Sequence, residues 1–289
     1  MVTAGYLGYV SLEGSRRIVR PERTPFVPWE GGPATPADLG LAYEDVRFTT
    51  RDGVLLEGWF IPSVRETDAA VIVMHGFTGH RLGELATYVP WLQPVYHVLQ
   101  FDFRGHGVSG EAPITLGARE QADVAAAVDH LRGRGIPRIA LLGLSMGAAT
   151  AILAGPDLPI AAVVADAPFA DLRNPIANRM RAEGYPLARL GAWIIVASAG
   201  LRSRARLVSP IQRVAQLAPR GLLIISPRDD ELIDHAQRVA LFEAAREPKE
   251  LYVVEGAQHV NARWVGGADY VQRVLAFLDR FLGDTPREG

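Results

Sequence analysis

A glycine-serine-glycine turn between two apolar runs constrains the fold of this chain more than any other stretch. The segment Gly143-Leu144-Ser145-Met146-Gly147 follows the β-prone run 138–142 and precedes the small-residue run 148–152. A strand, a tight turn and a helix in this order hold a serine on a strained turn, where its hydroxyl projects from the edge of a sheet. Glycines two residues to either side avoid Cβ clashes at such a turn. The pattern makes Ser145 the candidate nucleophile, and the rest of the chain has to supply its partners.

The chain around this turn alternates between strand and helix patterns. Two β-prone runs, 43–49 and 54–61, flank Arg51-Asp52-Gly53, which predicts an antiparallel hairpin. The expected strands after the hairpin are 69–74, 95–101, 138–144, 160–165, 221–226 and 250–254, and the expected helices are 82–92, 116–132, one directly after the turn, 234–245 and 268–282. This alternation is typical of a parallel sheet covered by helices on both faces. We therefore expect an α/β fold with an eight-stranded, mostly parallel sheet flanked by helices.

Two segments stand outside this alternation. Residues 21–40 contain five prolines, so an extended N-terminal arm is expected over residues 1–41. Residues 168–218 contain no clear strand, and the apolar stretch 187–199 indicates a helix that is too short and interrupted to span a bilayer. We interpret 168–218 as a helical cap inserted after the sixth strand. The core domain is then expected to comprise residues 42–167 and 219–289.

Composition narrows the classes of function. The 289 residues include no cysteine, which excludes disulfides, thiolate zinc sites and a cysteine nucleophile. A net charge of −2 provides no basic footprint for nucleic acid, which is therefore not an expected partner. Residues 1–12 are uncharged, but they are too few to span a bilayer and no basic segment precedes them. We expect a cytoplasmic protein, with a truncated N-terminal membrane anchor or an export signal as the open alternative.

Two residues fall where a serine nucleophile needs partners. Asp230 follows the seventh expected strand, and His259 follows the eighth. The order nucleophile, acid, histidine, each on a loop after a strand, resembles the α/β-hydrolase family, and the resemblance runs from about residue 43 to the end. It implies that Ser145 attacks, that His259 transfers the proton and that Asp230 orients the histidine.

The resemblance also bears on the choice of acid and on the oxyanion donors. In Pro227-Arg228-Asp229-Asp230, Asp230 stands in the register of the family's acid, with proline in place of the usual glycine, and Asp229 is the alternative. The backbone N–H groups of Phe77 and Met146 are implied as the donors to the oxyanion. Residues 101–109 resemble a turn that is mainly structural in the family.

The expected cap is basic, with eight arginines and two acidic residues in 168–218. Such a cap over an acidic body favours anionic substrates or peripheral contact with an anionic membrane surface. Arginines that simply solvate the outer face of the cap are the alternative. The candidates for the substrate pocket are large side chains of the cap, with plain packing against the body as the alternative: Phe169, Tyr185, Leu187 and Trp193.

These features predict a serine hydrolase that cleaves carboxylic esters of small molecules through an acyl-enzyme, as a carboxylesterase or small lipase does. The same triad serves thioesterases, amidases and serine peptidases, so the bond type stays open. A non-catalytic binding protein on the same fold is the alternative from another class. His75, His80 and His106 have no metal-ligand spacing with a carboxylate, so no metal is expected. Hydrolysis through an acyl-enzyme needs no cofactor, and none is expected. The sequence leaves the oligomeric state open.

Overall fold

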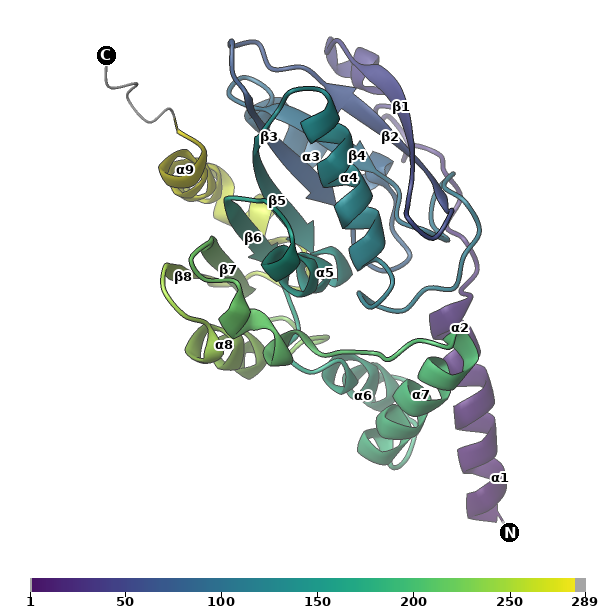
Figure 1. Cartoon of the computed structure of the whole chain (residues 1–289). Coiled ribbons are helices and arrows are strands. Elements are labelled where there is room, and N and C mark those ends of the chain that lie inside the picture. The colour runs from purple at the N-terminus through teal and green to yellow at the C-terminus, as the bar shows by residue number, and fades with distance from the viewer. Residues whose placement is uncertain (1, 284–289) are drawn as a thin grey trace.

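A computed structural model describes residues 2–283 of the chain, and this part contains one sheet of eight strands (Figure 1). The strands are β1 (Glu44–Thr49), β2 (Leu55–Ile61), β3 (Ala69–Met74), β4 (His97–Phe101), β5 (Arg138–Leu144), β6 (Ala162–Asp166), β7 (Gly221–Pro227) and β8 (Lys249–Val254). Their order is β1-β2-β4-β3-β5-β6-β7-β8. β2 is antiparallel to both β1 and β4, and all other pairs are parallel. The predicted α/β fold with a mostly parallel sheet is confirmed.

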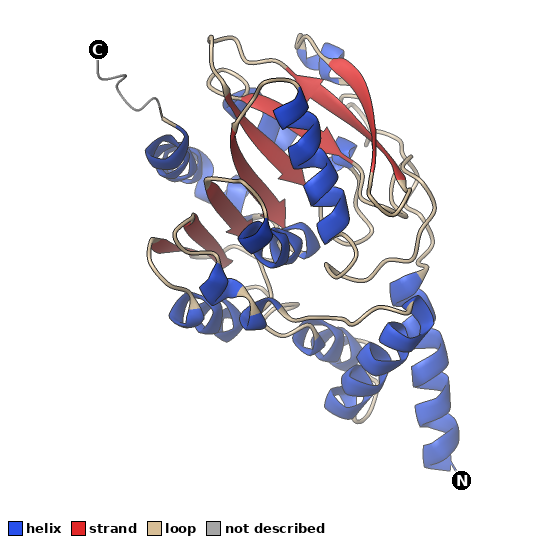
Figure 2. Cartoon of the chain, in the orientation of Figure 1, coloured by secondary structure: helices blue, strands red, loops and turns tan. Residues whose placement is uncertain are grey.

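Helices cover both faces of the sheet (Figure 2). Those of the core are α3 (Arg81–Leu92), α4 (Gln121–Gly133), α5 (Met146–Ala154), α8 (His235–Ala244) and α9 (Ala262–Leu282). Residues of α3 and α9 form one apolar core with the sheet, and residues of α4, α5 and α8 form the other. The inner strands are buried on both faces for this reason, as β3 and β7 are along their whole length.

The loop after β4 is a buried polar network. The Asp102 carboxylate accepts a hydrogen bond from the backbone N–H of Arg81 at 2.7 Å and also pairs with the guanidinium of Arg81. Arg104 is fully buried and pairs with Asp123 on α4 and with Asp52 in the β1–β2 turn. Charges buried in this way need several partners, and the network supplies them. Residues 101–109 thus form a structural turn that ties the hairpin, α3 and α4 together.

The N-terminal segment differs from the extended arm expected over residues 1–41. Residues 2–19 are helical as α1 (Val2–Tyr9), a π-helical turn (Val10–Gly14) and α2 (Ser15–Val19), and the extended stretch begins only at Arg20. The prolines that indicate an arm all lie beyond this point. The preceding residues are stabilised as helices because they pack against a helix of the cap.

The inserted segment between β6 and β7 forms α6 (Arg173–Ala182) and α7 (Ala188–Ser203), followed by two short 3-10 turns, Pro210–Gln212 and Val214–Gln216. α7 lies against the N-terminal helices at the lower right of Figure 1. A Cβ atom on Gly14 would lie only 2.5 Å from Ile195, so the two helices are in close contact there. Tyr6 donates to the Pro186 carbonyl at 2.6 Å. Among the described helices, none combines the length and the apolar character needed to cross a bilayer.

Candidate active site

Ser145 lies on a tight turn between β5 and α5. Its backbone angles, φ 51° and ψ −109°, are strained for a residue that carries a side chain. A Cβ atom on Gly143 would lie 2.4 Å from the carbonyl carbon of Gly147, and one on Gly147 would lie 2.5 Å from the carbonyl oxygen of Met74. The backbone N–H of Ser145 donates to the carbonyl of Asp166 at 2.8 Å. The turn therefore requires both glycines and is held against β6.

Three side chains from three loops form a chain of hydrogen bonds. Ser145 Oγ lies 3.0 Å from His259 Nε2, and His259 Nδ1 lies 2.9 Å from Asp230 Oδ2. A carboxylate can only accept, so Nδ1 carries the proton and Nε2 accepts from the serine hydroxyl. The three residues follow β5, β7 and β8, whose carboxyl ends meet at one edge of the sheet. The structure thus brings together the three residues that the sequence had placed on separate loops.

The Asp230 carboxylate is buried and well supplied with donors. Its Oδ1 accepts from the backbone N–H groups of Leu232 at 3.0 Å and Ile233 at 2.9 Å. Burial on its own would raise the pKa of Asp230, but the hydrogen bonds from His259 and Ile233 lower that pKa below its ordinary value. The neighbouring Asp229 is exposed, and its side chain has no hydrogen-bond or ion-pair partner in residues 2–283. Of the two adjacent acids, Asp230 is the one in contact with the histidine.

A fully buried arginine supports this carboxylate. Arg238 on α8 donates to Asp230 Oδ2 at 3.2 Å, to Ser226 Oγ at 2.8 Å and to the Pro227 carbonyl at 2.8 Å. Burial lowers the pKa of Arg238, and the negative charge of Asp230 opposes that shift. A buried ion pair needs good geometry and further hydrogen bonds to offset the loss of hydration. These contacts provide both, so Arg238 fixes the position of Asp230.

The loop after β3 passes close to the serine. A Cβ atom on Gly76 would lie 3.5 Å from the Cβ of Ser145. The backbone N–H of Phe77 donates to no protein group within the described residues. Met146 is the first residue of α5, where backbone N–H groups have no helical acceptor. Two backbone donors therefore lie near Ser145 without an obligatory partner.

His75 supports this loop, and both of its ring nitrogens form hydrogen bonds to the backbone. Its Nδ1 donates to the Gly76 carbonyl at 2.8 Å, and its Nε2 accepts from the backbone N–H of Phe103 at 3.1 Å. Burial lowers the pKa of His75 well below its ordinary value, and the positive character of His106 acts in the same direction. His75 is therefore a neutral, structural histidine.

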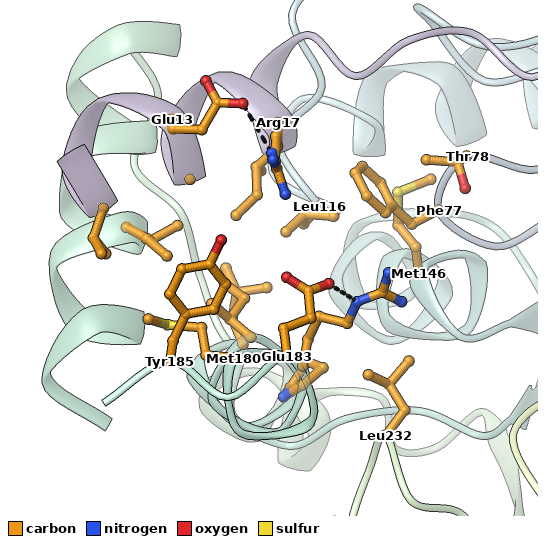
Figure 3. A pocket seen from close by; sticks show the side chains of 18 of the residues that line it. Glu13, Arg17, Phe77, Thr78, Leu116, Met146, Met180, Glu183, Tyr185 and Leu232 are labelled. Atoms are coloured by element: carbon orange, nitrogen blue, oxygen red, sulfur yellow. Dashed lines mark hydrogen bonds and ion pairs between the residues drawn. The ribbon is translucent and has the colours of Figure 1, made fainter. Parts of the chain in front are cut away.

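A cavity of about 390 Å³ opens beside Ser145 (Figure 3). Its volume is within the range of small-molecule sites. The wall is mainly apolar and combines residues of the N-terminal helices, the core and the cap, including Ile18, Leu116, Met146, Met180, Ile195 and Leu232. Two ion pairs lie in the wall: Glu13 with Arg17, both labelled in Figure 3, and Arg179 with Glu183.

The four pocket candidates divide into two pairs. Phe169 and Tyr185 line the cavity, and Figure 3 shows the side chain of Tyr185 in its wall. Leu187 and Trp193 do not line it, because their side chains face solvent with 56% and 57% of their surface exposed. The prediction is wrong for these two residues, since α7 packs against the molecule through its alanine-rich face instead.

Three kinds of known protein data match this chain: a family sequence model, protein sequences and solved structures. The sequence model of the family described as serine aminopeptidase, S33, matches residues 65–207. The protein YqkD of Bacillus subtilis is 31% identical over 242 residues, which cover 81% of this chain and 78% of YqkD. The structure of the Pyrococcus furiosus esterase Pf2001 is 30% identical with a TM-score of 0.77, covering 92% of this chain and 99% of that chain. The chain belongs to the α/β-hydrolase family.

This α/β hydrolase is also similar to the α/β hydrolase domain-containing protein WAV2 of Arabidopsis thaliana. The two are 28% identical over 274 residues, which cover 89% of this chain and 85% of WAV2. Within residues 2–283, no group of three or more histidine and acidic side chains could hold a metal ion.

Two features of the α/β-hydrolase site were missed by sequence reasoning. Arg238 was not singled out, although a basic residue inside the helix that follows the acid could have indicated a buried partner. The contribution of Val10, Gly14 and Ile18 to the cavity was also missed. Apolar residues at a spacing of four in 10–18 were the available signal for a helix with one buried face.

Proposed function

We propose that this α/β hydrolase is a serine esterase that cleaves carboxylic esters with an apolar acyl group. The observation that carries the proposal is the hydrogen-bonded series of Ser145, His259 and Asp230 beside an apolar cavity. A serine hydroxyl is a poor nucleophile unless an adjacent base takes its proton, and His259 Nε2 is within hydrogen-bond distance of that proton.

The proposed reaction has two halves. Ser145 Oγ attacks the ester carbonyl carbon while His259 Nε2 takes the hydroxyl proton, and the carbonyl electron pair moves onto oxygen. Collapse of this intermediate breaks the bond to the alcohol oxygen, which receives the proton from His259, and leaves an acyl group on Ser145. Water then attacks the acyl-enzyme with the same histidine as base, and the carboxylic acid and free Ser145 are released. Asp230 keeps the proton on Nδ1 and stabilises the imidazolium.

The developing negative charge on the carbonyl oxygen needs donors in fixed positions. We assign this role to the backbone N–H groups of Met146 and Phe77. Both residues line the cavity together with Ser145. Donors held by the backbone need no reorganisation as the charge forms, which is the main source of such stabilisation.

The name of the matched family raises a serine aminopeptidase as the second candidate. An aminopeptidase has to bind a free ammonium group, for which a carboxylate without another ion-pair partner is a suitable group. The two glutamates of the cavity wall, Glu13 and Glu183, are already paired with Arg17 and Arg179. The pairing favours substrates without a free amine, and the esterase name of Pf2001 agrees with that preference.

Hydrolysis of nitrophenyl esters tests the proposal. Ser145→Ala and His259→Ala should each lower kcat by about 10³-fold or more, and Asp230→Asn by a comparable factor. Asp229→Asn is the matched control and should stay within about twofold of the parent protein. A phosphonofluoridate probe should label Ser145 in the folded protein. Retention of most activity by Ser145→Ala would refute the assignment.

An ester, the anilide with the same acyl group and an aminoacyl anilide together test the bond type. We expect the ester to be hydrolysed faster than the matching anilide or aminoacyl anilide. A higher kcat/KM for the aminoacyl anilide would favour the aminopeptidase.

A further inference from the structure

Helix α7 is apolar on its solvent face as well as on its packed face. The buried positions are Ala188, Ala192, Ile195 and Ala199. On the opposite face, Leu190, Trp193 and Leu201 leave 46%, 57% and 82% of their surface exposed. With 3.6 residues per turn, these three positions fall within an arc of about 80° and extend along about 16 Å of the helix. Amphipathic helices of globular proteins carry polar residues on this face, so the exposed stripe needs an explanation.

The charged side chains that α7 itself and the residues following it carry are all positive, and Asp234 is an acidic residue that lies near Arg189 and Leu190. Residues 184–228 contain no Asp or Glu. Arg189, Arg204 and Arg206 are exposed and form no salt bridge in the described part of the chain. Three other arginines of the cap are paired with carboxylates: Arg173 with Asp171, Arg179 with Glu183 and Arg213 with Asp157. We define the α7 surface as the apolar residues Leu190, Trp193 and Leu201 with the unpaired arginines Arg189, Arg204 and Arg206.

Exposed tryptophan and leucine beside unpaired arginines are the combination found on helices that lie in the interface of an anionic bilayer. α7 has 16 residues, which suits a helix that lies along a membrane and is too short for one that crosses it. A second copy of this chain is a poorer partner. A symmetric contact through this surface would bring the unpaired arginines of both copies together, and the carboxylate of Asp234 near Arg189 would offset only part of that charge.

We propose that the α7 surface docks the protein on bilayers that contain anionic phospholipids. The apolar stripe enters the interface, and the arginines contact headgroup phosphates. Ile195, on the packed face of the same helix, lines the cavity beside Ser145. Docking therefore places the cavity about one helix diameter, roughly 10 Å, from the lipid.

Co-sedimentation with vesicles measures this docking without reference to hydrolysis. The full chain should bind vesicles of phosphatidylcholine with phosphatidylglycerol at least about tenfold more tightly than vesicles of phosphatidylcholine alone, and added salt should weaken that binding. Trp193→Ser should weaken binding about tenfold. Arg189→Gln and Arg204→Gln should each weaken it about fivefold.

Two matched control variants distinguish binding through the α7 surface from nonspecific adsorption to vesicles. A measurement of folding excludes misfolding as the cause of any loss. Trp264→Ser removes a tryptophan of α9 that is 66% exposed, and Arg65→Gln removes an exposed arginine of the β2–β3 loop. Both should bind like the parent protein, and circular dichroism should show that all variants are folded. Equal binding to both kinds of vesicle, or equal loss in Trp193→Ser and Trp264→Ser, would overturn the proposal. So would light scattering that shows a parent dimer which Trp193→Ser converts to a monomer, since a second copy would then cover the surface.

Discussion

Replacing Arg238 with methionine isolates the contribution of the buried Arg238–Asp230 pair. The substitution keeps much of the side-chain volume but removes three hydrogen bonds, to Asp230, Ser226 and the Pro227 carbonyl. Breaking a buried ion pair from one side lowers the free energy of unfolding by about 3–5 kcal/mol. Asp230 keeps His259 and two backbone donors, so we expect a loss at the lower end, about 3 kcal/mol at pH 7.

A double-mutant cycle assigns this loss to the pair. Urea unfolding followed by tryptophan fluorescence gives the free energies of the parent, Arg238→Met, Asp230→Asn and the double variant. We expect a coupling energy of about 2 kcal/mol, because the double variant leaves no buried charge without a partner. Arg238→Lys keeps the charge but loses the forked geometry and should lie between the parent and Arg238→Met.

One result of the double-mutant cycle would contradict the expected coupling between Arg238 and Asp230. If Arg238→Met lowers stability equally in the parent and in Asp230→Asn, within about 0.5 kcal/mol, the two side chains do not stabilise each other. The support that Arg238 gives to the carboxylate would then be ruled out.

Glu84, Gly147 and Gly14 each make a contact that a single substitution can test. Burial raises the pKa of Glu84 to about 8, with the charge of Asp166 as a second cause, so ionisation destabilises the fold as pH rises from about 4.5 to 8. Glu84→Gln should therefore raise the melting temperature above pH 8, by the equivalent of about 2 kcal/mol after screening by solvent, and leave it unchanged near pH 4. Gly147→Ala should destabilise the protein by about 2 kcal/mol and reduce ester hydrolysis, because its Cβ would meet a backbone carbonyl at 2.5 Å. Gly14→Val should change the ratio of kcat/KM for long and short acyl esters by about tenfold, because its side chain would displace the N-terminal helices from Ile195 at the cavity wall.

Each of these predictions has an outcome that contradicts it. A melting-temperature difference for Glu84→Gln that is the same at low and high pH would rule out titration of this carboxyl. Parent-like stability of Gly147→Ala would show that the turn can relax around a methyl group. An unchanged chain-length profile for Gly14→Val would exclude the N-terminal helices from acyl selection.

The central strands and the turn at Ser145 could be predicted from local sequence. β3 and β5 begin and end where the apolar runs 69–74 and 138–144 do, because strands covered on both faces are apolar throughout. The expected helix 116–132 begins only at Gln121. The reason is a local turn: Leu116 has a φ of 52°, and the Glu120 carboxylate accepts hydrogen bonds from the backbone N–H groups of Thr115 and Gly117.

The N-terminal helices and the exposed positions of Leu187 and Trp193 also escaped prediction, because both depend on contacts between distant segments. The N-terminal helices contain several glycines and are stabilised by α7, about 180 residues away, so local propensity does not indicate them. Leu187 and Trp193 are large apolar residues of the cap, and the sequence offers no more than this to make them pocket candidates. α7 is apolar on both faces, and periodicity alone does not tell which face is buried.

The composition of the cavity wall has a consequence for how selectivity can change. The groups that would carry out the reaction are anchored to the sheet, whereas Val10, Ile18 and Met180 of the wall come from the N-terminal helices and the inserted segment. Neither of these segments contributes a strand. Grafting a different N-terminal helix or cap onto the same sheet would therefore give a new acyl preference while the strand pairing stays intact. The N-terminal helices and the inserted segment could therefore be exchanged independently of the sheet that holds the reacting groups.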